Sequence, residues 1–72
     1  MARPASVFAK IQSNQQRNEL ATLWRENPHH YTRMRAHAII LSDDQYEIEQ
    51  IVEIFGVKRD TVRDWIRRFE QG

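Results

Sequence analysis

Apolar residues recur at three- and four-residue spacing along most of this chain, the spacing that places them on one face of an α-helix. The pattern predicts four helices, at about residues 13–26, 29–41, 47–55 and 58–70. No segment shows the sustained alternation of apolar and polar residues that a half-buried strand requires, and there is no hairpin dipeptide. The sequence therefore predicts an all-α fold.

The clearest pattern runs from Ile48 to Phe69, where two short amphipathic helices are separated by Gly56. Glycine tolerates positive φ, so Gly56 can end the first helix and turn the chain, with Val57 packed beneath the corner. Two amphipathic helices joined by a short turn containing glycine form the helix-turn-helix pattern. The apolar stripes are Ile48, Ile51, Val52 and Phe55 in the first helix and Val62, Trp65, Ile66 and Phe69 in the second.

The two preceding helices are bounded by capping residues and a proline. Ser13 and Gln16 have the spacing of a capping box, and Pro28 ends one helix and can begin the next. The helix at 29–41 has a wide apolar face and should be the central, most buried element, followed by a polar turn at residues 42–45. The last three helices then predict a right-angled three-helix core, with the first helix packed on it as an extra layer.

Residues 1–12 carry only a weak pattern, and we expect them to form a flexible N-terminal arm. Arg3 and Lys10 also allow an arm that lies along DNA, because short basic arms reach the minor groove in some DNA-binding domains. Residues 13–72 then make up the helix-turn-helix DNA-binding domain.

Size and composition narrow the classes of function. A chain of 72 residues forms one small domain, whose core supplies only about 3–5 kcal/mol, so a multi-step enzyme with a deep pocket is not expected. The absence of cysteine excludes disulfides and thiolate metal sites. The longest apolar run is far shorter than the ~20 residues of a membrane span, and no secretory signal is expected. We expect a cytoplasmic, nucleoid-associated protein with no cofactor, no membrane partner and no small-molecule ligand.

The net charge of +1 conceals strong segregation. Every charge between Ser42 and Phe55 is negative, whereas five basic residues and two aspartates lie between Lys58 and Phe69. A basic helix beside an acidic one has a local field that the average charge understates. This arrangement favours a DNA-reading helix, although two solvated helix faces would also account for it.

The candidate DNA contacts lie mainly on the last helix. Arg59, Arg63 and Arg67 are four residues apart and share a face, and arginine is the usual reader of guanine in the major groove. An alternative is that the arginines and aspartates only form surface ion pairs. The candidates for base contacts are Lys58, Arg59, Asp60, Thr61, Arg63, Asp64 and Arg67, and those for phosphate contacts are Arg33, Arg35 and Arg68.

Other residues that could carry chemistry are expected to be structural. The three histidines have no cysteine near them, and a structural zinc site needs four close ligands, so no metal site is expected. A catalytic set could be drawn from Ser42, His37 and Asp43, but nothing in the sequence fixes their geometry, and no catalytic residue is expected. The aromatic residues expected in the core, rather than as base-stacking platforms, are Trp24, Tyr31, Tyr46, Trp65 and Phe69.

From about Ser13 onward the chain resembles the N-terminal DNA-binding region of mariner-like bacterial insertion-sequence transposases. The resemblance is carried by NPHHYTRMRAHAIILSDD and by YEIEQIVEIFGVKRDTVRDWIRRFEQG. The second segment is typical of helix-turn-helix proteins of many kinds, and the first narrows the choice. The resemblance implies a homeodomain-like tri-helical fold that binds the terminal inverted repeats of a mobile element. Gln45 stands where such a turn would have glycine, and Glu47 stands where serine or threonine would cap a helix.

Such transposases also carry a catalytic domain with three spaced carboxylates and two metal ions. The carboxylates here fall in one acidic stretch and one helix, so we expect this chain to bind double-stranded DNA without cutting it. It could be an excised domain, one frame of a split transposase, or a stand-alone transcriptional regulator or antitoxin-like DNA binder that forms a homodimer on DNA. A hypothesis from another class is a protein-interaction module that holds a basic partner with its acidic helix.

Overall fold

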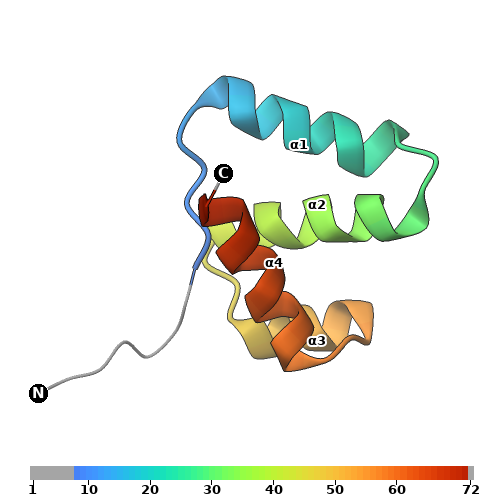
Figure 1. Ribbon diagram of the computed structural model, residues 1–72, viewed down its shortest axis with the longest axis vertical. Helices are drawn as coiled ribbons and strands as arrows, with labels where there is room; N and C mark the ends of the chain where they lie inside the picture. Colours follow the sequence, from blue (N-terminus) through green and yellow to red (C-terminus); the bar gives the residue numbers. More distant parts are fainter. Residues whose placement is uncertain (1–7, 72) are drawn as a thin grey trace, which may run out of the picture.

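The computed structural model describes residues 8–71, and this part of the chain consists of helices and their connections, without strands. The helices are α1 (Asn14–Glu26), α2 (His30–Asp43), α3 (Ile48–Phe55) and α4 (Arg59–Gln71). In Figure 1, α1 runs antiparallel along one side of α2, while α3 lies on the other side and α4 returns from α3 toward α2. The predicted all-α class is confirmed.

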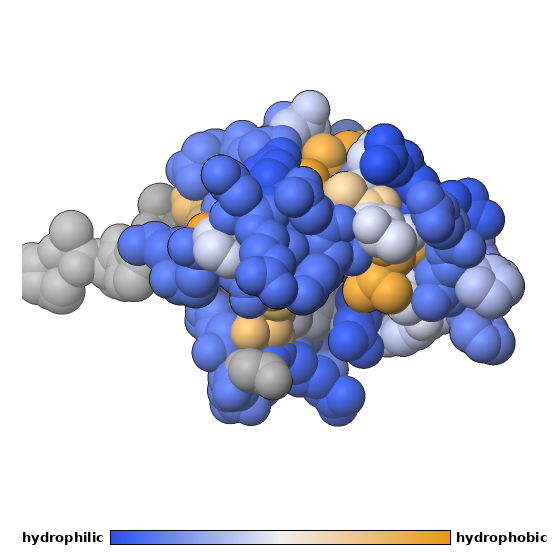
Figure 2. All heavy atoms as spheres, turned by 90° about the horizontal axis from the view of Figure 1, so that it is seen from above, coloured by the Kyte–Doolittle hydropathy of each residue, from blue (hydrophilic) through white to orange (hydrophobic). Residues whose placement is uncertain are grey.

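Helix α1 is capped by Ser13, whose Oγ accepts a hydrogen bond from the backbone N–H of Gln16 at 3.1 Å. The side chain of Gln16 accepts from the backbone N–H of Gln12 at 2.6 Å, so the second half of the expected capping box is replaced by a bond one residue earlier. None of the α1 residues is fully buried. The surface seen from above, over α1, is accordingly mostly hydrophilic with small apolar patches (Figure 2).

Helix α2 is the central element, because it contacts each of the other three helices. It runs through Asp43, two residues beyond the range that the sequence indicated, and its buried residues are Ala36, Ala38, Ile39, Ile40 and Ser42. Ser42 was expected in a polar turn, but its side chain is completely buried. The apolar run that the sequence shows is therefore shared between two sides of one helix, with α1 on one side and α3 and α4 on the other.

Two left-handed residues bracket α3. Gly56 ends the helix with φ 67° and ψ 35°, and its N–H donates to the carbonyl of Val52 at 2.8 Å, which confirms the predicted glycine turn. Gln45 precedes the helix with φ 75°, at the position where a glycine was expected. The N-terminus of α3 is capped better than Glu47 alone suggests, because the side chain of Gln50 accepts from the Glu47 N–H at 2.8 Å.

The core joins α2, α3 and α4 and includes one residue from before α1. Its buried members are Ala9, Ala38, Ile39, Ile51, Val62, Trp65 and Ile66. Ala9 is completely buried, although it lies in the segment expected to be flexible. Burial of an alanine side chain requires its backbone to lie against the core as well, so residues 8–12 belong to the packed unit.

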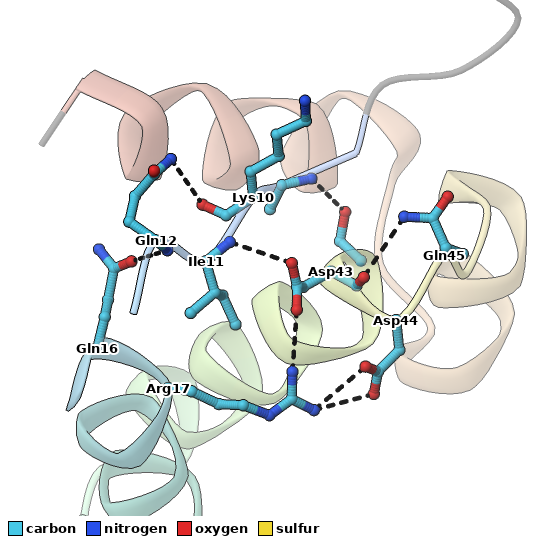
Figure 3. A network of polar contacts seen from close by, with 10 residues as sticks. Lys10, Ile11, Gln12, Gln16, Arg17, Asp43, Asp44 and Gln45 are labelled. Carbon is cyan, nitrogen blue, oxygen red and sulfur yellow. Dashed lines mark hydrogen bonds and ion pairs between the residues drawn. The ribbon is translucent and has the colours of Figure 1, made fainter. Parts of the chain in front are cut away.

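We call residues 8–12 the N-terminal strap. Its backbone N–H groups donate to the C-terminal end of α2: Ala9 to Ser42 Oγ at 2.8 Å and Ile11 to Asp43 Oδ1 at 3.1 Å. Arg17 completes this network, shown in Figure 3, by pairing with Asp43 Oδ2 at 2.9 Å. The expected flexible arm thus has two parts: residues 1–7 lie outside the described residues, and residues 8–12 are held against α2.

A stack of rings joins three helices around His37. The imidazole of His37 stacks on Trp24 of α1 with ring centroids 4.1 Å apart, and its edge meets Phe55 of α3 at 5.3 Å. Burial lowers the pKa of His37 below its ordinary value, because the protonated form loses hydration there. This histidine therefore acts as an aromatic packing residue.

Candidate nucleic-acid interface

Helix α4 buries one face and presents the other to solvent. Val62, Trp65 and Ile66 are buried against the core. Since each residue turns an α-helix by about 100°, the residues between these anchors project away from the protein. Of the residues proposed to contact bases, those that are exposed are Lys58, Arg59, Asp60, Arg63 and Arg67, and those that are partly buried are Thr61 and Asp64.

The N-terminal end of α4 is set by Lys58, which lies just before the helix. Its carbonyl accepts from the N–H groups of Thr61 at 3.0 Å and Val62 at 3.2 Å, while its side chain is exposed. Asp60 lies in the first turn, where a carboxylate is favourable to the helix dipole. A structural role in starting the helix therefore accounts for Asp60 without any contact to DNA.

Arg63 and Arg67 are cations of the predicted set that are available to a ligand, as are Lys58 and Arg35. Both are exposed, they are four residues apart on one face, and within residues 8–71 neither forms an ion pair. Two unneutralised like charges at this spacing mildly destabilise an isolated helix. Their arrangement therefore suits an anionic ligand better than it suits the stability of α4.

Two other cations of the set, Arg59 and Arg68, are paired within the protein. Arg59 Nη2 lies 2.8 Å from Glu49 Oε2 of α3, and Arg68 Nε lies 3.0 Å from Asp64 Oδ2 one turn earlier on α4. Both pairs are substantially exposed, so each contributes at most about 1 kcal/mol and can exchange its carboxylate for another anion. The pair with Glu49 nevertheless directs Arg59 toward α3, a partnership ten residues apart in sequence that helical spacing alone could not indicate.

The predicted phosphate contacts do not lie together. Arg35 of α2 and Arg68 of α4 line one groove of about 330 Å³, which also includes Trp65. Arg33 is two residues from Arg35 and so points about 160° away from it around α2. Its Nε donates to the carbonyl of Trp24 at the end of α1, at 3.3 Å. The structure brings Arg35 and Arg68 together and leaves Arg33 on the side of α1.

Tyr31 is a further candidate for a contact at this interface, although the sequence predicts that it lies in the core. The structure corrects this: Tyr31 is 54% exposed, and Tyr46 is 38% exposed. The hydroxyl of Tyr31 accepts a hydrogen bond of 2.7 Å from Nε1 of Trp65, and the two rings meet edge to face at 5.7 Å. Its position in the sequence could have identified it: Tyr31 is in the first turn of α2, four residues before the phosphate candidate Arg35 and on the same face of the helix.

Ser42, His37 and Asp43, the catalytic set that can be drawn from the sequence, have structural partners. Ser42 and Asp43 hold the N-terminal strap, and His37 is stacked between aromatic rings. Residues 8–71 contain no group of three or more histidine, cysteine, aspartate or glutamate side chains placed to hold a metal ion. In the same range, no helix has the length and hydrophobicity needed to cross a lipid bilayer.

Comparison with known families gives one result. The family model described as a homeodomain-like domain matches residues 29–72, which spans α2, the turn at Gly56 and α4. Neither a curated protein nor a solved structure was found to match the chain. The match begins just before α2 and leaves α1 and the strap outside it.

Proposed function

This chain belongs to the homeodomain-like domain family, a helix-turn-helix family whose membership suggests DNA binding, and we propose that it is a sequence-specific reader of double-stranded DNA. In this proposal α4 enters the major groove with its N-terminal half facing the bases. The observation that carries it is the exposed pair Arg63 and Arg67, which project from a helix anchored on its opposite face and have no ion-pair partner within residues 8–71.

Each proposed contact has a chemical role. Arg63 and Arg67 are suited to bidentate recognition of guanine, and Lys58 and Thr61 extend the contact surface at the start of α4. Arg59 and Asp64 would exchange or share their intramolecular partners when DNA is bound. Arg35 and Arg68 are assigned to phosphates, as is Arg33, although Arg33 would reach only DNA that also passes the α1 side. Asp60 would accept from cytosine N4 or orient a neighbouring arginine.

We further propose that the chain is the DNA-recognition part of a transposase and binds the terminal inverted repeats of a mobile element. Two segments support this: residues 27–44 and 46–72 both resemble the DNA-binding region of mariner-like insertion-sequence transposases. The alternative within the same class is a stand-alone regulator that binds a palindrome as a homodimer.

The first test is binding itself. Selection from random duplexes should yield a preferred site, and fluorescence anisotropy should then show an affinity that falls steeply with salt, with a log–log slope of several units. Arg63→Ala should weaken binding by about 1–3 kcal/mol and relax the preference at one base pair. A flat salt response together with no enriched site would contradict DNA recognition.

The transposase role needs a separate test. The DNA on either side of the coding sequence should contain inverted repeats, and the protein should bind these repeats more tightly than scrambled duplexes of the same composition. Sedimentation should show a monomer in the absence of DNA. A stable dimer that prefers a palindrome near its own promoter would favour the regulator instead.

A further inference from the structure

We propose that Tyr31 is a DNA-backbone contact, with its hydroxyl held in position by the indole of Trp65 so that its proton can be donated to a phosphate oxygen. This rests on the proposed function, because it assigns a new residue to the same interface. Tyrosine side chains are among the groups that commonly donate to phosphates and thereby fix the register of a protein on DNA.

The hydrogen bonding of Tyr31 leaves its proton available. Trp65 is only 2% exposed, and a buried indole N–H requires an acceptor, which the Tyr31 oxygen provides at 2.7 Å. A phenolic hydroxyl has one proton as well as its acceptor sites. Within residues 8–71 Tyr31 donates to no acceptor, and more than half of its surface is open to solvent. The indole therefore holds the oxygen in place, and the hydroxyl proton remains available to an acceptor outside the described residues.

The position of Tyr31 places that proton beside the reading helix. Along α4, Trp65 follows Thr61 by four residues and precedes Arg68 by three, so these residues form one side of the helix. On α2, Arg35 lies one turn after Tyr31. Trp65, Arg35 and Arg68 line the same groove, and Tyr31 is joined to it by its contact with Trp65. We call Tyr31, Arg35, Thr61 and Arg68 the α2-side flank of α4. This flank offers one DNA strand the guanidinium group of Arg35, unpaired in the described part of the chain, the guanidinium group of Arg68, which can exchange Asp64 for a phosphate, and the hydroxyl of Tyr31.

The opposite side of α4 is less suited to a phosphate. There Arg59 is paired with Glu49, and α3 also exposes Glu53 one turn further on. Carboxylates close to a phosphate repel it, and this repulsion opposes docking of the DNA backbone along α3. A helix in the major groove lies between two DNA backbones. On the α2-side flank Arg35 and Arg68 are balanced by Glu19 and Asp64, whereas on the α3 side three carboxylates outnumber the cations Lys58 and Arg59. Charge therefore favours the closer approach of a backbone on the α2-side flank.

The test compares two single-atom deletions. Tyr31→Phe should weaken binding to the selected duplex about tenfold, the loss expected for a hydrogen bond to a charged group. The salt slope should stay the same, since a neutral hydroxyl displaces no counterion, whereas Arg68→Ala should lower it by about one unit. Tyr46→Phe is the matched control, because Tyr46 is partly exposed but lies before α3, and its affinity should stay within about twofold of the original.

A second measurement uses the unmodified protein, because Tyr31→Phe also leaves the Trp65 N–H without its acceptor and can destabilise the fold. The chain has two tryptophans, so its NMR spectrum contains two indole N–H signals. On titration with duplex DNA, the Trp65 signal should shift as Tyr31 engages a phosphate. The Trp24 signal, from the ring stacked on His37, should stay in place.

The outcomes separate this proposal from the proposed function. If Tyr31→Phe is less stable but binds DNA with unchanged affinity, and the Trp65 indole signal does not move, Tyr31 serves only Trp65 and the proposal is overturned. DNA recognition by α4 would then still stand, provided that Arg63→Ala loses affinity. If the unmodified protein shows no salt-dependent binding, both proposals fail.

Discussion

Two groups of arginines, one in each half of this molecule, have different roles. In the half formed by the strap, α1 and α2, Arg17 is bound to Asp43 and Asp44 and links segments that are 26 and 27 residues apart. In the half formed by α3 and α4, Arg63 and Arg67 extend into solvent without an ion pair in the described part of the chain. Residue type alone does not distinguish an arginine that stabilises the fold from one that can bind a ligand. The distinction depends on whether a carboxylate of the same protein is paired with it.

The largest expected effect comes from removing the two groups of arginines in separate variants. The double variant Arg63→Ala, Arg67→Ala should lose about 2–6 kcal/mol of DNA-binding free energy, the sum of two base contacts, with little change in stability. Arg17→Ala should do the opposite and lower the free energy of unfolding by about 1 kcal/mol without weakening binding. Anisotropy titrations and urea unfolding measure the two quantities. Equal losses of affinity in both variants would remove the distinction.

The strap should matter for stability and not for binding. Ser42→Ala leaves the buried N–H of Ala9 without an acceptor, which should lower the free energy of unfolding by about 1–3 kcal/mol. Ser13→Ala is a useful comparison, since it removes the exposed cap of α1 and should cost about 1 kcal/mol. Urea unfolding followed by circular dichroism gives both values. An unchanged midpoint for Ser42→Ala would show that the strap is not held as described.

The two left-handed turns around α3 should respond with opposite signs. Gly56→Ala should destabilise by about 1 kcal/mol, purely through φ, because an added Cβ would meet no atom within 4 Å. Gln45→Gly should stabilise by about 0.5–1 kcal/mol, because it relieves a side chain held at φ 75°. Thermal unfolding of both variants measures the difference. Destabilisation by Gln45→Gly would mean that the side chain contributes more than its backbone strain costs.

The smallest effect expected is a pH dependence centred on His37. Its pKa is lowered in the folded state, so at acidic pH the unfolded chain binds this proton more readily than the folded one. The stabilisation is therefore complete above a pH of about 6.5, the ordinary value, and is lost as pH falls through the lowered folded pKa. As the pH falls below about 6.5, the urea midpoint of the original protein should decrease relative to that of His37→Phe, which cannot bind this proton. A parallel pH profile would exclude His37 as a contributor.

The positions of the helices could be predicted from the sequence, but the contacts between segments distant in sequence could not. The turn at Gly56 and the apolar stripe of α4 follow from local spacing, which is why both could be anticipated. Ala9 and Ser42 could not, because their burial depends on the strap meeting the end of α2, 33 residues away. The exposure of Tyr31 could not be predicted either: it lies on the apolar stripe of α2, but the contact with Trp65 of α4 leaves more than half of its surface open to solvent.

In the candidate site, too, local features could be predicted from the sequence and contacts between helices could not. That α4 carries exposed basic residues could be predicted from the sequence, since the period of its apolar residues fixes which positions face outward. Which arginines are already paired could not, because the contact between Arg59 and Glu49 depends on the angle between α3 and α4. The separation of Arg33 from Arg35 could have been predicted, because two residues on a helix never share a face at that spacing.

A map of backbone amide shifts on addition of the selected duplex tests the central claim most directly. Our account predicts that the largest changes fall on residues 58–68 of the α4 region, with a second group around Tyr31 and Arg35. Changes confined to residues 43–54, the acidic stretch and α3, would contradict it and would assign the protein to partner binding through its acidic helix.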